Sequence, residues 1–431
     1  MALSRDGAEI TNNWGAQGAH PLPQGAAGRC RRCVAARGRG CIRAMADRDR
    51  SDDRPRTALV LSGGGARGAY QAGVLQGLVE IGMIGAAGSP FDVIVGSSAG
   101  SINAGMLAAH ADRLREGVER LIEVWGGITA SDVFRTDIAS LGRIGARWAW
   151  DLSFGGALKR VQPKSLLDTA PLRQLLKRVP LARIDEHVRS GALHAVAVAA
   201  TDLYTSHGYL FLHGHPSIRP WKRSRWRIER TKLTIDHLMA SSAIPIFFPS
   251  VRIEGRHFGD CCIRNTAPLS PAINLGAERI VAIGVQGPGA GDPSTTRRLP
   301  PPTIAQIAGV LLDAVMLDAI ESDVEHSGRV NRSVLSCRAG GSSRDAFRLV
   351  DVLWLRPSIH IGSLAAALST HVPPAVRYLM RGLGTDESIT ELVSYLLFDP
   401  VFTTRLIEAG RADVRAARAE ILRFANTPSA E

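Results

Sequence analysis

One serine stands at the centre of Gly96-Ser97-Ser98-Ala99-Gly100, a pattern whose flanking residues suggest chemistry. The stretch 91–95 before it is mostly apolar or β-branched, and a run of small residues with helical character follows at 101–109. A strand, a Gly-x-Ser-x-Gly turn and a helix in that order are the context of a nucleophile elbow. The glycines permit a sharp backbone turn, and the first N–H groups of the helix favour a developing negative charge. The pattern predicts Ser98 as a nucleophile.

A second glycine-rich turn, Gly63-Gly64-Gly65-Ala66-Arg67-Gly68, follows the apolar stretch 57–61 and precedes a helical pattern that ends near Gly82. The spacing also fits the dinucleotide fingerprint, which would make the protein a nucleotide-dependent oxidoreductase. That reading requires an acid at the end of the second strand, where this sequence has the serine turn instead. We therefore interpret Gly63, Gly64 and Gly65 as an oxyanion hole, with Arg67 adding positive charge.

The serine needs a base, and the residues alone leave two options open. His257 or His371 following Asp202 would satisfy the chain order of a Ser, acid, His triad. Asp260, in a turn ahead of a Pro-Leu pair, could instead act directly as the base if burial adjusts its pKa. The chemistry gives Asp260 a modest edge.

Two strands joined by a helical crossover make a βαβ unit, so the sequence predicts an α/β fold. Further strands are expected at 192–199, 209–212 and 280–285, and 110–190 is expected to be mainly helical. Helices are also predicted at 303–332, at 385–397 and at 404–425, the last as an exposed closing helix.

The composition is that of a globular chain, with 45% apolar and 21% charged residues among 431. No apolar run is long enough to span a bilayer and no secretory leader is visible, so we expect a cytoplasmic protein with at most peripheral membrane association. The net charge of +12 favours anionic partners without choosing among them.

Residues 1–55 are expected to be a disordered basic tail, with Met45 as a possible start of the functional chain. The tail cysteines Cys30, Cys33 and Cys41 lack a fourth ligand for zinc.

Residues from about 57 to 285 resemble the patatin-like phospholipase family in four blocks. These are the glycine loop (with Ser62 where many members have Asp), the serine elbow, Ala240-Ser241-Ser242-Ala243-Ile244-Pro245, and Asp260 at the position of the family's Asp-Gly-Gly/Ala motif. The resemblance implies a Ser98–Asp260 dyad without histidine, and a mostly parallel sheet between helices. It also implies hydrolysis of a lipid ester of the phospholipase or lysophospholipase type, without cofactor or metal.

Cys261 departs from the family pattern, which has glycine after the aspartate. If that position required positive φ, cysteine would add about 1–2 kcal/mol of strain and weaken activity. The alternative function is therefore a catalytically weak domain that acts as a membrane-surface regulator or binding module. We place the catalytic domain at 56–290 and a mainly helical C-terminal region that packs on it at 291–431.

The run from Arg219 to Lys232 combines many cations with Trp221 and Trp226. Such a run suits an anionic membrane surface or single-stranded nucleic acid, although a solvated loop is the commonest explanation. We expect a lipid ester as the substrate and no nucleic acid partner, with peripheral membrane binding as a hypothesis.

Overall fold

The computed structural model describes residues 55–135, 165–219, 221–264, 268–287, 301, 318–339, 348–373, 377 and 390–426. Residues 55–431 form one compact unit. The predicted tail, including its three cysteines, lies outside the described residues apart from Pro55. The proposed division near residue 290 stays a prediction.

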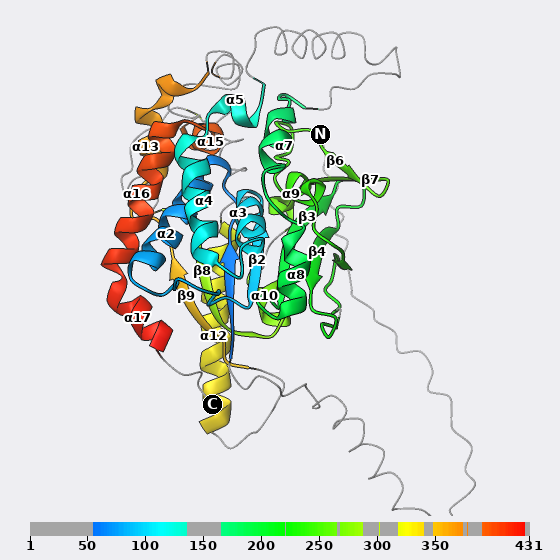
Figure 1. The fold of residues 1–431 in the computed structure, drawn as a ribbon, viewed down its shortest axis with the longest axis vertical. Helices are drawn as coiled ribbons and strands as arrows, with labels where there is room; N and C mark the ends of the chain where they lie inside the picture. The colour runs from blue at the N-terminus through cyan, green and yellow to red at the C-terminus, as the bar shows by residue number, and fades with distance from the viewer. Residues whose placement is uncertain are drawn as a thin grey trace, which may run out of the picture. The chain divides into compact units, whose positions relative to one another are not determined.

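A nine-stranded sheet forms the centre of the unit, with seven strands in the order β5-β4-β3-β2-β1-β8-β9 (Figure 1). Its strands are β1 (Arg56–Leu61), β2 (Val93–Ser97), β3 (Ala195–Asp202), β4 (Gly208–Gly214), β5 (Trp226–Arg230), β6 (Val251–Ile253), β7 (Arg256–Asp260), β8 (Ala277–Ile283) and β9 (Asp351–Leu355). The pairings from β3 through β2, β1 and β8 to β9 are parallel. Antiparallel pairs join β3 to β4, β3 to β7 and β6 to β7. The predicted α/β fold with a mostly parallel sheet is confirmed.

The central strands are buried on both faces, which explains their nearly continuous apolar sequences. In β1, Leu59 and Leu61 point into one core cluster, whereas Ala58 and Val60 point into the other. The predicted βαβ unit is also confirmed, because β1 and β2 are parallel and pair from Ala58 with Val93 onward, with a helix between them in the chain.

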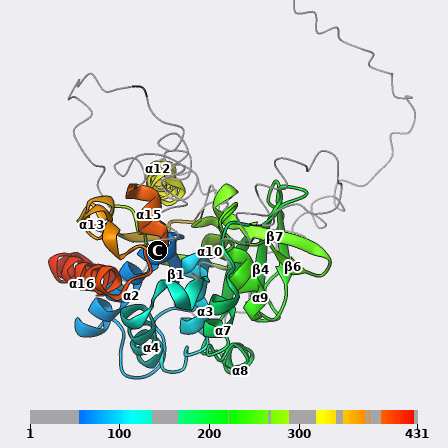
Figure 2. The same ribbon diagram turned by 90° about the horizontal axis from the view of Figure 1, so that it is seen from above.

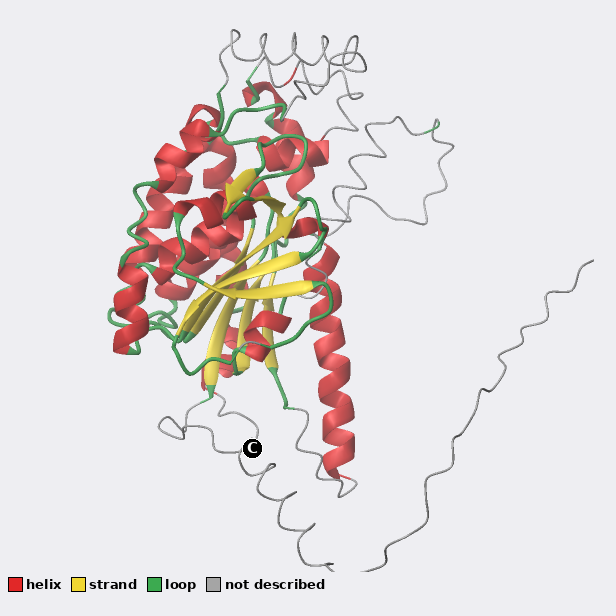
Figure 3. Ribbon diagram, turned by 90° about the vertical axis from the view of Figure 1, so that its right-hand side faces the viewer, coloured by secondary structure: helices red, strands yellow, loops and turns green. Residues whose placement is uncertain are grey.

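Helices cover both faces of the sheet (Figure 3). The larger core cluster packs residues of α2, α3, α4 and α16 against one face, and the smaller cluster packs residues of α10 and α12 against the other. The helices are α2 (Gly68–Glu80), α3 (Ala99–Ala108), α4 (Leu114–Gly127), α5 (Ala130–Val133), α7 (Ala170–Leu176), α8 (Arg183–Ser190), α9 (Ile235–Ser241), α10 (Ser270–Asn274), α12 (Asp318–Ala339), α13 (Ile361–Ala367), α15 (Thr390–Leu396), α16 (Pro400–Ala416) and α17 (Arg418–Asn426). Three short 3₁₀ turns are η1 (Gly65–Arg67), η2 (Cys261–Ile263) and η3 (Ser369–His371).

The C-terminal region takes part in this core. It contributes β9, a strand that the sequence analysis did not predict, and it packs α16 against α2. The prediction of an exposed closing helix at 404–425 is wrong, because Leu406 and Val414 of α16 are fully buried. The apolar face of that helix covers α2, while its arginines remain at the surface.

Two predicted helices are seen only in part. The helix predicted at 303–332 overlaps α12, and residues 303–317 lie outside the described residues. The helix predicted at 385–397 overlaps α15, and residues 385–389 lie outside the described residues as well.

Seen from above, the hairpin β6–β7 and the helix α16 lie at opposite ends of the sheet (Figure 2). None of the helices described is both long and apolar enough to cross a bilayer.

Candidate active site

Ser98 occupies a strained turn between β2 and α3, as the elbow pattern predicts. Its backbone has φ 52° and ψ −126°, a conformation that costs a non-glycine residue about 1–3 kcal/mol. The turn is tight on both sides, because a Cβ on Gly96 would collide with the backbone of Gly100, and one on Gly100 would collide with Leu61. The Ser98 N–H donates a hydrogen bond to Ser241 Oγ at 2.9 Å. The serine is therefore held in place by close packing and by α9.

The glycine loop at the end of β1 lies against this serine. A Cβ built on Gly63 would stand 2.9 Å from Ser98 Cβ, which leaves room only for glycine. Gly64 and Gly65 both have positive φ, at 154° and 56°. The N–H groups of Gly63 and Gly64 donate no hydrogen bond to any residue that the structure describes. Pairing of β1 with β2 thus brings the two glycine-rich turns together, and it leaves N–H donors unused beside the serine hydroxyl.

Arg67 is buried, with 2% of its surface exposed. Its Nε donates to Ser394 Oγ at 2.8 Å, and its guanidinium lies 4.4 Å from the centre of the Tyr395 ring. A Cβ on Gly65 would collide with the Tyr395 carbonyl oxygen. These contacts tie the glycine loop to α15. A direct role of Arg67 at the oxyanion stays a prediction.

Asp260 ends β7 and is fully buried. Its N–H donates to the Ala243 carbonyl at 2.9 Å, and its Oδ1 accepts from the Cys262 N–H at 3.0 Å. Burial raises the pKa of the carboxyl to about 6, and the nearby Ser98 hydroxyl is the largest influence that opposes this rise. The other oxygen, Oδ2, forms no hydrogen bond of good geometry with a described residue. A buried carboxylate with a raised pKa and an unused acceptor oxygen therefore lies close to the serine hydroxyl.

Cys261 does not introduce the strain considered from the sequence. Cys261 is not among the residues with positive φ, and it begins the 3₁₀ turn η2 directly after Asp260, whose φ is −53° and ψ 140°. Its side chain is buried, and burial together with the charge of Asp260 raises the pKa of the thiol far above its usual range. The thiol is held protonated beside the carboxylate and acts as a small apolar residue.

The histidines considered as alternative bases have other partners. His257 Nδ1 lies 3.1 Å from Ser250 Oγ, and His371 Nδ1 lies 3.1 Å from Asp399. Asp202 pairs with Arg256 at 2.9 Å instead of orienting a histidine. Within the described part of the chain, no hydrogen bond joins a histidine to Ser98. The structure does not assemble the triad.

A buried polar network supports the two turns and was not found from the sequence. Gln71 Nε2 donates to the Ser62 carbonyl at 2.8 Å, and its Oε1 accepts from Asn103 Nδ2 at 2.9 Å. Trp125 Nε1 in turn donates to Asn103 Oδ1 at 2.8 Å. Each residue looks ordinary in a helical sequence, so only their meeting in space identifies them. The network fixes α2, α3 and α4 around the serine.

An apolar cavity of about 60 Å³ opens at Ser98 and Gly65. Its walls come from α3, α4 and α7 and from the segment after α9. Apolar side chains form nearly all of its lining, among them Ile102, Met106, Trp125, Leu172, Phe248 and Phe398. The apolar lining suits a hydrocarbon chain attached to a group that reacts at Ser98.

The cationic run at 219–232 forms β5 and the loop before it. Both of its tryptophans pack against the smaller core cluster, and the guanidinium of Arg223 lies 4.5 Å from the centre of the Trp226 ring. Lys222 and Arg225 remain exposed. A membrane anchor would require these two tryptophans at the surface, but they pack against the sheet instead.

No cluster of three or more potential metal-binding side chains occurs among the described residues. The groups gathered at Ser98 are a hydroxyl, a carboxylate and backbone N–H donors. This set is suited to acyl transfer through a covalent intermediate.

One comparison with known proteins identifies a family. A family model described as patatin-like phospholipase matches residues 59–273. Among curated proteins, no sequence matches the chain significantly.

Three solved structures illustrate the structural similarity. VipD from Legionella pneumophila is 12% identical over 84% of this chain and 68% of its own, with a TM-score of 0.29. Human GIVD cytosolic phospholipase A2, in complex with a fluorophosphonate inhibitor, is 13% identical over 88% of this chain and 60% of its own, with a TM-score of 0.42. Full-length ExoU with SpcU from Pseudomonas aeruginosa is 14% identical over 86% and 80%, with a TM-score of 0.27. The match thus spans about 60% of the length of the human enzyme chain.

Proposed function

Residues 59–273 belong to the patatin-like phospholipase family, and from this premise we propose that the protein is a serine acyl hydrolase that cleaves lipid esters through a Ser98–Asp260 dyad. The observation that carries the proposal is the pairing of a strained, buried serine with a buried carboxyl whose pKa is raised to about 6. A structural serine has no need of positive φ, and a structural aspartate is normally fully hydrogen-bonded.

In the first half of the proposed reaction, Ser98 Oγ attacks the carbonyl carbon of the ester and its proton passes to Asp260 Oδ2. The N–H groups of the Gly63–Gly65 loop stabilise the oxyanion that forms. Collapse of this intermediate breaks the carbon–oxygen bond to the alcohol, which leaves with the proton from Asp260. The product is an acyl-enzyme ester on Ser98.

In the second half, Asp260 removes a proton from water, and the resulting hydroxide attacks the acyl carbon. The bond to Ser98 Oγ breaks, the serine regains its proton from Asp260, and the fatty acid departs. A pKa near 6 suits a carboxyl that must accept and return a proton near neutral pH.

The apolar cavity supports a substrate with an acyl chain. Its present volume of about 60 Å³ is too small for a long chain, so α4 and α7 must move apart when the chain enters. Binding the chain between these helices would place the ester carbonyl between Ser98 and the glycine loop, because Ser98 and Gly65 both line the cavity.

The decisive experiment is labelling of the full-length protein with a fluorophosphonate probe, together with turnover of a p-nitrophenyl ester and of a phospholipid. Ser98→Ala should abolish labelling and lower turnover at least about a thousandfold. Asp260→Asn should lower kcat by about a hundredfold or more. Ser333→Ala, at an exposed position of α12, is the matched control and should behave like the wild type. Labelling that persists in Ser98→Ala would refute the proposed nucleophile.

The alternative of a catalytically weak regulator rested on strain at Cys261, and the backbone there has no positive φ. The hydrolase is therefore the better supported proposal. Peripheral binding to anionic membranes is a separate proposal, which the exposed cations Lys222 and Arg225 support.

A further inference from the structure

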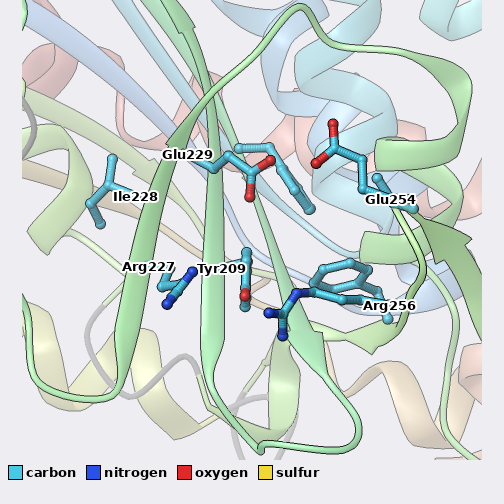
Figure 4. Close-up of a pocket in the computed structure, with 9 residues that line it drawn as sticks. Tyr209, Arg227, Ile228, Glu229, Glu254 and Arg256 are labelled. Carbon is cyan, nitrogen blue, oxygen red and sulfur yellow. The ribbon is translucent and has the colours of Figure 1, made fainter.

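A second cavity, of about 500 Å³, lies at the β5 edge of the sheet, between β4, β5 and the hairpin β6–β7 (Figure 4). We refer to it as the sheet-edge pocket. It shares no lining residue with the apolar cavity at Ser98. Nothing in the proposed hydrolysis uses it.

The apolar lining of the sheet-edge pocket is aromatic and rigid. Tyr209, Phe211 and Phe258 are each at most 2% exposed. The Phe258 ring meets the other two edge to face, at centroid distances of 4.9 Å from Tyr209 and 5.4 Å from Phe211. Because these rings are buried, they form a rigid floor beneath the charged side chains, and the charged side chains are the groups that a ligand can contact.

The charged side chains of the pocket form two rows of opposite sign. On β5, Arg227 and Glu229 are two residues apart, so they project from the same face about 7 Å from each other along the strand. The parallel register sets Arg227 beside Tyr209 and Glu229 beside Phe211. In Figure 4, the carboxylates of Glu229 and Glu254 lie at one end, and Arg227 and Arg256 lie at the other on either side of Tyr209.

Three of these four charges are not neutralised within the described part of the chain. The side chains of Arg227, Glu229 and Glu254 form neither a hydrogen bond nor an ion pair with any residue that the structure describes. Arg256 is held by Asp202 at 2.9 Å, with its guanidinium 6.0 Å from the centre of the Tyr209 ring. Burial and repulsion by Glu254 raise the pKa of Glu229, while Arg227 and Arg256 oppose this rise. A cation between the two carboxylates would relieve their repulsion.

We propose that the sheet-edge pocket binds a small zwitterion, with its ammonium group between Glu229 and Glu254 and its phosphate or carboxylate group at Arg227 and Arg256. A simple anion would be repelled by the acidic row, and a simple amine by the basic row. A calcium ion requires six to eight oxygen ligands, whereas this pocket offers two carboxylates over aromatic rings. A ligand carrying both charges satisfies both rows at once.

Phosphoethanolamine has this chemistry, and it occurs both as a free metabolite and as the head group of a lipid. Isothermal titration of the full-length protein should therefore compare O-phosphoethanolamine with ethanolamine and with glycerol 3-phosphate. We expect the zwitterion to bind at least tenfold more tightly than either single-charge compound. Equal affinity for glycerol 3-phosphate, or no binding of the zwitterion, would overturn the proposal.

Variants test the two rows separately. Glu229→Gln and Arg227→Gln should each weaken binding of O-phosphoethanolamine at least tenfold. The matched controls are Glu186→Gln, on α8, and Arg252→Gln, on β6, which are exposed and do not line the pocket. They should leave the affinity unchanged. An equal loss in the controls would show that net charge, and not the pocket, governs binding.

Vesicle sedimentation identifies the source of the ligand. Phosphatidylethanolamine vesicles that retain the wild type but release Glu229→Gln would assign the pocket to a lipid head group. Binding of the free compound without vesicle retention would assign it to a soluble zwitterion. The Ser98→Ala variant should bind O-phosphoethanolamine like the wild type, so the titration succeeds or fails independently of the proposed hydrolysis.

Discussion

Replacement of Asp260 by asparagine should make the protein more stable while it removes the proposed catalytic base. Asparagine keeps the oxygen that accepts the Cys262 N–H, and it removes the buried charge. The carboxylate is wholly buried and is balanced by no cation within the described residues. The wild type therefore bears a free energy cost whenever this group is ionised.

The size of this cost follows from the pKa. Burial raises the pKa of Asp260 from 3.8 to about 6, and each pKa unit corresponds to 1.36 kcal/mol, so the cost is about 3 kcal/mol. Because the folded-state pKa lies above the unfolded one, the folded protein binds more protons between pH 3.8 and about 6. The stability contribution of the protonated form is thus fully present below pH 3.8, and it is lost as pH rises through about 6.

Urea unfolding of wild type and Asp260→Asn from pH 4 to pH 8 measures this difference directly. We expect the variant to gain about 3 kcal/mol over the wild type at pH 8, and little at pH 4. Asp351→Asn, at an exposed position at the start of β9, is the control for a general charge effect. A variant gain that does not change with pH, or a loss at pH 8, would refute the assignment of a costly buried charge at this position.

Four further outcomes are expected. In the wild type, kcat/KM for an ester should rise with pH through about 6 and then level off, because the base must be ionised; a rate already constant from pH 4.5 would contradict this role for Asp260. Ser241→Ala leaves the N–H of the nucleophile without its acceptor, so thermal unfolding should show a loss of about 1–3 kcal/mol that Ser241→Thr restores in part. Ile102→Phe narrows the apolar cavity, and the ratio of kcat/KM for octanoyl to butyryl p-nitrophenyl esters should fall; an unchanged ratio would place the acyl chain elsewhere. Lys222→Glu with Arg225→Glu should reduce sedimentation with phosphatidylglycerol vesicles, and undiminished sedimentation would retire the membrane proposal.

Local patterns predicted the parts of the site that depend on neighbouring residues. A strand, a glycine turn and a helix are adjacent in sequence, so both turns could be located, and parallel pairing of β1 with β2 brings them together. The strained backbone of Ser98 follows from the same pattern. The residues alone gave Asp260 only a modest edge over a histidine, and the family resemblance decided the choice, because the approach of Asp260 to the serine depends on the pairing of β7 with β3, far away in sequence.

Other features lay beyond the reach of local patterns. The strand β9 has a short apolar sequence, and only its partner β8 makes it part of the sheet. In β5, Trp226 and Ile228 alternate with Arg227 and Glu229, which is the period of two of a strand. The sequence analysis considered only the charge of this run and did not predict the strand. The contact of α15 with the glycine loop joins residues more than 300 positions apart, which no window along the sequence can detect.

That long-range contact has a consequence for the order of events during synthesis. The loop containing Gly65 packs against Tyr395, and Arg67 is held by Ser394. A ribosome therefore releases the elbow, the glycine loop and the buried carboxylate long before the helix that braces them. Until that helix emerges, the nascent chain carries every reactive group yet lacks the support that gives them their final arrangement.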